Sequence, residues 1–131
     1  MSQDQFVQRP YQEPGSPTGA PVFSSQPYDD ILLSSLEGFG KLLRERITSL
    51  RELIAAEDRA GFVAVCHKAA GSALTFGYGE IARQLKIMED AAKRGAPQVE
   101  LGMLLKLAAK LADRILLGIR IKLALPDSHE F

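Results

Sequence analysis

A chain of 131 residues is long enough for one hydrophobic core and too short for two full enzymatic domains. Its sixteen basic and sixteen acidic residues cancel, so the overall charge favours neither nucleic acid nor an anionic membrane as a partner. No run approaches the ~18 apolar residues of a membrane-spanning helix, and one cysteine allows neither an internal disulfide nor a zinc-binding pattern. We therefore expect a single cytoplasmic domain without membrane insertion.

The first 28 residues differ from the rest in composition. Five of the seven prolines lie there, among glutamine, serine and glycine. Proline removes backbone donors, and the few apolar side chains do not offset the entropy of ordering the segment. The composition predicts a flexible tail over residues 1–28, and a second, C-terminal tail over 126–131.

The first helical pattern covers about residues 29–56. Asp29 and Asp30 can cap its start, and Ser34 with Glu37 forms a second capping box. Gly38 and Gly40 follow this box, which predicts a short lead-in helix before the main one. Apolar residues then recur at intervals of three and four, at Leu36, Phe39, Leu43, Ile47, Leu50 and Ile54.

Three further helices are predicted over about 59–76, 80–93 and 98–123. Asp58 is a good N-cap for the first of them, and glycine or proline separates each helix from the next. Short loops favour antiparallel neighbours. The predicted fold is therefore all-α: an antiparallel up-and-down four-helix bundle over residues 29–125.

The second of these four helices has an unusual outward face. At about 100° per residue, one sector holds Phe62, Val65, Cys66, Ala69, Ala73 and Phe76 and should face the core. His67 points about 100° or more away from that sector. Its neighbours on the helix surface are Ala60, Val63, Ala64, Ala70, Gly71 and Leu74. A solvated face would have charged residues here, so the pattern indicates an accessible histidine on a flat surface.

Gly71 lies one turn after His67. Glycine inside a helix is less favourable than alanine by about 0.5–1 kcal/mol. Close packing against another helix of the bundle is one explanation, and close approach of another protein to the imidazole is the second. Beside an outward histidine with small neighbours, the second explanation is the better one.

The stretch from Cys66 to Gly77, CHKAAGSALTFG, resembles the signature of histidine-containing phosphotransfer (HPt) domains. That family has glycine four residues after the histidine, then a small residue, and a second glycine that ends the helix. The flanks also agree at Asp58, Phe62, Ile81, Met88 and Glu89, and the resemblance covers about residues 36–117.

The resemblance implies a phosphocarrier of a multistep, two-component phosphorelay. His67 would accept a phosphoryl group through Nε2 from a phospho-aspartate on a receiver domain, and pass it to another receiver aspartate. The implied partners are response-regulator receiver domains and a hybrid sensor histidine kinase. The implied magnesium ion belongs to the receiver, so we expect no cofactor or metal on this chain. Without a glycine-rich phosphate loop, we expect no ATP binding and no autokinase activity, and so no enzyme in its own right.

One departure from the family concerns the phosphate. The family usually has lysine three residues after the histidine, where its ammonium helps hold the phosphoryl oxygens, and this chain has Ala70. The candidates that could supply the charge instead are Lys68, Arg83 and Lys86, and the sequence does not choose among them. The missing lysine keeps a second hypothesis open, a non-catalytic module that binds a receiver or kinase on the same fold. A purely structural bundle is the third.

The last predicted helix has more apolar residues than one core stripe needs. The excess lies at Leu107, Leu116, Leu117, Ile121, Leu123 and Leu125. These side chains could pack against the lead-in helix or the tail, or form a contact between two copies of the chain. The sequence therefore leaves a homodimer open.

Overall fold

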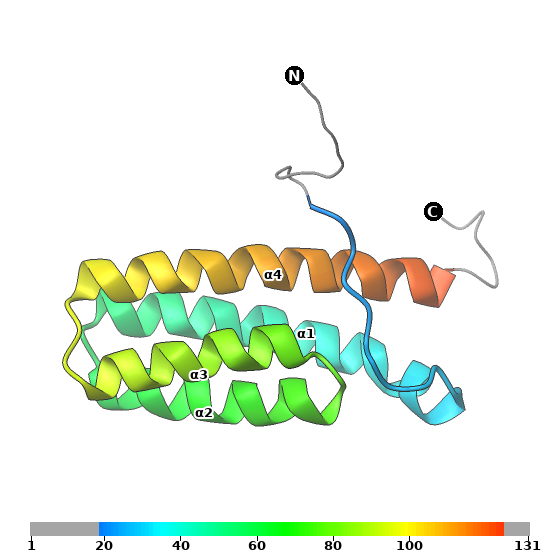
Figure 1. Cartoon of the computed structure of the whole chain (residues 1–131), viewed down its shortest axis with the longest axis horizontal. Helices are drawn as coiled ribbons and strands as arrows, with labels where there is room; N and C mark the ends of the chain where they lie inside the picture. Colours follow the sequence, from blue (N-terminus) through cyan, green and yellow to red (C-terminus); the bar gives the residue numbers. More distant parts are fainter. Residues whose placement is uncertain (1–18, 125–131) are drawn as a thin grey trace, which may run out of the picture.

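The computed structural model describes residues 19–124, and this part of the chain forms four α-helices and no strand. The helices are α1 (Asp30–Ala55), α2 (Arg59–Thr75), α3 (Gly79–Lys93) and α4 (Gln98–Ala124). They lie side by side in one bundle around a core of apolar side chains (Figure 1). The prediction of an all-α, four-helix fold is confirmed at this level. Within 19–124 no helix combines the length and the apolar character needed to cross a membrane.

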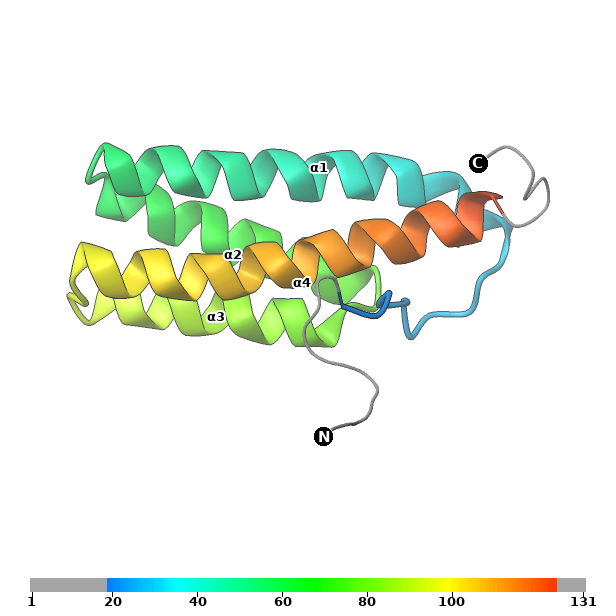
Figure 2. The same cartoon turned by 90° about the horizontal axis from the view of Figure 1, so that it is seen from above.

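Each helix packs against two others. α1 contacts α2 and α4, and α3 contacts α2 and α4, so α2 and α4 occupy opposite corners of the bundle. The connecting loops alternate between the two ends of the bundle (Figure 2). Because α2 and α4 occupy opposite corners, their outward faces point to opposite sides of the molecule.

Two predicted helix starts are confirmed in atomic detail. Asp29 accepts a hydrogen bond from the backbone N–H of Leu32 at 2.9 Å, and Asp58 accepts one from Gly61 at 2.9 Å. Each carboxylate satisfies a backbone donor that has no partner within its helix. Gly77 ends α2 with a φ of 85°, a conformation that glycine adopts without steric strain.

The prediction of a separate lead-in helix is wrong, because α1 is one continuous helix from Asp30 to Ala55. The Ser34 hydroxyl donates to the carbonyl of Ile31 inside this helix and caps nothing. Gly40 is buried, and a Cβ there would lie 3.2 Å from the side chain of Leu116 on α4. Close packing of α1 on α4 therefore offsets the poor helix propensity of Gly40, while Gly38 is exposed and has no neighbour within 4 Å of a Cβ.

Residues 19–28, called the strap below, differ from the predicted flexible tail. The strap crosses α4 and then passes along the end of the bundle to the start of α1 (Figure 1). The N–H of Val22 donates to the carbonyl of Arg114 at 3.0 Å, and the hydroxyl of Ser24 donates to the carbonyl of Phe76 at 2.5 Å. The Phe76 carbonyl is one that the end of α2 leaves unpaired, whereas the Arg114 carbonyl lies inside α4 and accepts the strap as an additional donor. Together the two bonds hold the segment in place. The other residues of the two predicted tails lie outside the described part of the chain.

The strap also covers part of the extra apolar surface of α4. It crosses at Gly118, which is buried, and Leu117 and Ile121 nearby are half-buried. Leu116 is also half-buried, and it packs against Gly40 of α1. Leu107 and Leu123 remain exposed, and Leu125 lies outside the described residues. Packing against the tail, one of the three explanations for the apolar excess, therefore applies near Gly118. A homodimer stays a prediction.

Candidate functional site

The inward side of α2 is the one expected from its apolar spacing. Phe62, Cys66, Ala69 and Ala73 are buried in the core, while Val65 and Phe76 are half-buried. This orientation leaves the opposite side of α2 facing solvent.

On the outward side, 72% of the His67 side chain is exposed. Of the small and apolar residues predicted around it, Ala60, Ala64, Gly71 and Leu74 are exposed, and Val63 and Ala70 are half-buried. Leu74 has 61% of its surface accessible, which is high for a leucine. The imidazole therefore stands on a surface with little charge on its own helix.

The surroundings of Gly71 exclude one of the two explanations given above for a glycine at this position. Nothing lies within 4 Å of the position that a Cβ would take at this residue. Close packing against another helix is therefore wrong. The space above Gly71, one turn from His67, is open to solvent.

The inner nitrogen of the imidazole faces a carboxylate on α3. His67 Nδ1 lies 3.3 Å from Oε2 and 3.4 Å from Oε1 of Glu89, whose side chain is only 3% exposed. An ionised carboxylate only accepts hydrogen bonds, so this contact favours the tautomer with hydrogen on Nδ1. In that tautomer Nε2 has the free lone pair, and it is a nucleophile without a separate base.

Two lysines of α3 keep this carboxylate ionised. Lys93 Nζ lies 3.0 Å from Oε2, and Lys86 Nζ lies 3.7 Å from Oε1. The hydrogen bond from Lys93 lowers the pKa of Glu89, and the hydrogen bond from His67 and the charge of Lys86 act in the same direction, against the effect of burial. Glu89 is therefore an anion that holds one imidazole and two ammonium groups around it.

The contact between His67 and Glu89 and the presence of Lys93 were not predicted. Glu89 was noted only as a flanking position of the family, and Lys93 only as the end of a helix. A signal was available, because Lys86, Glu89 and Lys93 are three and four residues apart and so share one face of α3. What the sequence did not specify was that this face turns toward α2.

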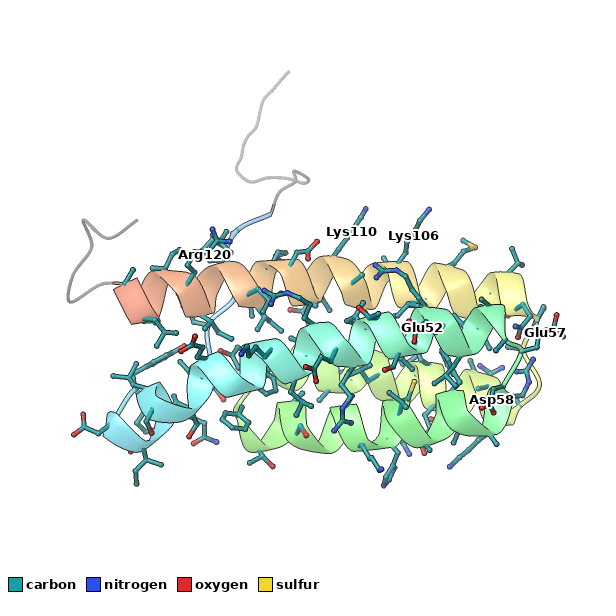
Figure 3. The ribbon with its side chains drawn as sticks, turned by 180° about the vertical axis from the view of Figure 1, so that it is seen from behind. Glu52, Glu57, Asp58, Lys106, Lys110 and Arg120 are labelled. Carbon is teal, nitrogen blue, oxygen red and sulfur yellow. The ribbon has the colours of Figure 1, made fainter. Side chains whose placement is uncertain are left out.

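The three predicted phosphate-stabilising residues have different surroundings. Lys86 shares Glu89 with His67, as described above. Lys68 and Arg83 are exposed, and neither forms an ion pair with any residue in the described range 19–124. Lys106 and Lys110 extend from α4 away from the other helices (Figure 3), so they serve no group on α2.

Cys66, next to His67 in the sequence, belongs to the core. Burial raises the pKa of its thiol to about 12, with a smaller contribution from the charge of Glu89. A thiol in this state is neither a nucleophile nor a metal ligand near neutral pH. Among residues 19–124, no three His, Cys, Asp or Glu side chains are grouped so that they could hold a metal ion.

Comparison with known proteins does not assign this chain to a family. It matches no protein-family model, no curated protein and no solved structure.

Proposed function

We propose that this protein is a histidine phosphotransfer protein of a two-component phosphorelay, with His67 as the phosphoryl acceptor on an antiparallel, up-and-down bundle. The observation that carries the proposal is the contact of Glu89 with Nδ1 of an imidazole that is 72% exposed. One ring nitrogen is held by a buried anion, and the other faces solvent. This division suits a nucleophile that reacts with a group brought by another protein.

The proposed reaction begins with a receiver domain that has an aspartyl phosphate. Nε2 of His67 attacks phosphorus, the bond between phosphorus and the aspartate oxygen breaks, and the electron pair leaves with the carboxylate. The imidazole is then positively charged, with its remaining hydrogen on Nδ1, and the nearby Glu89 carboxylate stabilises that charge. Reversal of these steps on a second receiver passes the phosphoryl group on.

The chemistry needs a partner that brings its active site close to the imidazole. The surface around His67 fits that need, since Ala60, Ala64 and Gly71 have no long side chain to obstruct a second protein. Leu74, exposed on the same side, would be covered on docking. We propose receiver domains of response regulators and of a hybrid sensor kinase as these partners, with magnesium bound on the receiver.

A phosphoryl-transfer assay tests the proposal. The chain is incubated with a panel of receiver domains labelled on aspartate, and the transferred label is tested for the acid lability and alkali stability of phosphohistidine. We expect label on the wild-type chain and none on His67→Gln, with both proteins equally helical by circular dichroism. Tight receiver binding without label would favour a non-catalytic binding module. Neither label nor binding would favour a structural bundle.

A further inference from the structure

The proposed function leaves open which cation binds the phosphoryl oxygens on His67, and the following inference rests on that function. A phosphoryl group brings close to two negative charges to Nε2. The other nitrogen of the ring already contacts the Glu89 carboxylate. A nearby cation is needed to offset this accumulation of negative charge. On α2 the residue three positions after the histidine is Ala70, whose side chain has no charge.

The packing of α2 on α3 brings a lysine to the same level. His67 and Glu89 lie opposite each other, and the short loop between α2 and α3 reverses the chain direction. One turn forward from His67 along α2 therefore corresponds to one turn backward from Glu89 along α3, which brings Ala70 level with Lys86. The small side chain of Ala70 leaves room beside the imidazole for the longer lysine.

The two lysines that pair with Glu89 are held differently. Lys93 lies 3.0 Å from Oε2, a charge-assisted hydrogen bond of ordinary length. Lys86 lies 3.7 Å from Oε1 of Glu89 and 3.7 Å from Oδ1 of Asp90, and 56% of its side chain is exposed. An ammonium shared between two carboxylates at these longer distances is loosely held. A phosphoryl group on His67 can attract it, while Lys93 continues to pair with Glu89.

The geometry points to Lys86 as the residue that binds the phosphoryl oxygens on His67, in the role that a lysine at position 70 would otherwise have. Oε1 of Glu89 contacts both His67 Nδ1 and the Lys86 ammonium. Before phosphorylation, the ammonium is therefore separated from the imidazole by a single carboxylate oxygen. Lys93 has a different task, which is to hold Glu89 against the imidazole.

A small phosphoramidate donor tests this assignment without a receiver. In that reaction Nε2 bonds to phosphorus, the phosphorus–nitrogen bond of the donor breaks and ammonia leaves. We expect Lys86→Ala to take up label on His67 about tenfold more slowly than wild type, the size expected for one charge-assisted contact at a partly exposed site. Lys106→Ala, a matched loss of a lysine on α4, should change the rate less than about twofold.

Restoring the charge from α2 is the second arm of the test. Adding Ala70→Lys to Lys86→Ala should recover most of the lost rate, because the new ammonium is one turn from His67. Failure of this rescue would contradict the inference, as would a normal rate in Lys86→Ala alone. A tenfold loss on Arg83→Ala with none on Lys86→Ala would transfer the role to Arg83.

The third arm separates direct binding of phosphate from an effect through Glu89. If Lys86 acts on the phosphoryl group, Lys86→Ala should slow labelling about tenfold in a Glu89→Gln background as well. No further loss in that background would mean that Lys86 only positions Glu89, and the inference would be wrong. If the wild-type chain takes no label from phosphoramidate or any receiver, the proposed function fails first, and this inference with it.

Discussion

Two glycines inside helices have opposite surroundings in this molecule. Gly118 of α4 is buried under the strap, where a Cβ would meet the carbonyl oxygen of Val22. Gly71 of α2 is exposed, and nothing lies within 4 Å of where its Cβ would be. Each glycine costs about 0.5–1 kcal/mol of helix stability relative to alanine. Of these two glycines, Gly118 is the one at which the described part of the chain fills the space that the missing side chain leaves.

The difference separates a glycine on which the chain packs its own backbone from a glycine that is open to solvent. At Gly118 the chain fills the space with its own backbone, so the glycine is explained by internal packing. At Gly71 the space remains open one turn from an exposed histidine, and internal packing offers no explanation. The proposed docking of a receiver domain would use this space.

The largest expected effect is on transfer, from a bulky side chain at Gly71. Gly71→Trp should lower the rate of phosphoryl transfer from a receiver about 100-fold, because the indole would hold the receiver away from Nε2. The transfer assay with purified protein measures this effect. Gly38→Trp on α1 is the matched control, since position 38 is also exposed and has nothing within 4 Å of a Cβ. An equal loss of transfer rate in both variants would contradict docking of the receiver at Gly71.

The next effect is on stability, from a side chain at Gly118. Gly118→Ala should lower the free energy of unfolding by about 2 kcal/mol, because the methyl group displaces the backbone of the strap. Urea unfolding followed by circular dichroism gives the value. The initial rate of labelling by phosphoramidate should stay within about twofold of wild type at the same time, because the strap does not contact His67. A stability equal to that of wild type would show that the strap does not depend on this glycine.

A methyl group at Gly71 should act in the opposite direction. Gly71→Ala should raise the free energy of unfolding by about 0.5–1 kcal/mol, since the new methyl group meets no neighbour and favours the helix. The same urea titration measures it. Destabilisation by this change would mean that the space above Gly71 is not open.

The smallest effect concerns acid. The pKa of Glu89 is lowered in the folded chain, chiefly by the hydrogen bond from Lys93, so its contribution to stability is present above the pKa of an unfolded glutamate and is lost as pH falls below it. Between about pH 6 and pH 3, the free energy of unfolding should therefore fall more in wild type than in Glu89→Gln. Equal losses in the two proteins would contradict the assigned ion pairs.

Local signals predicted most of the secondary structure. Asp58 and Gly77 lie where a capping side chain and a left-handed residue are needed, and both are readable from neighbouring residues. Gly38 and Gly40 misled the prediction, because propensity alone suggested a break and only the packing of Gly40 against α4 explains the continuous helix. Tertiary contacts overrode local preference there.

Long-range pairing explains what the sequence did not reveal. The strap is held by bonds such as the one from Ser24 to the carbonyl of Phe76, 52 residues away, and a proline-rich composition gives no sign of them. At the site, the outward facing of His67 followed from helical spacing. The contact with Glu89 and Lys93 depends on how α3 is rotated against α2, which periodicity within one helix does not determine.

The central claim is that Glu89 occupies one nitrogen of His67 and leaves the other for phosphorus. The most direct test is nuclear magnetic resonance of the phosphorylated chain with ¹⁵N-labelled histidine, because the coupling between phosphorus and nitrogen identifies the bonded atom. We expect phosphorus on Nε2 of His67 in the wild-type chain. Phosphorus on Nδ1, or on a residue other than His67, would contradict it.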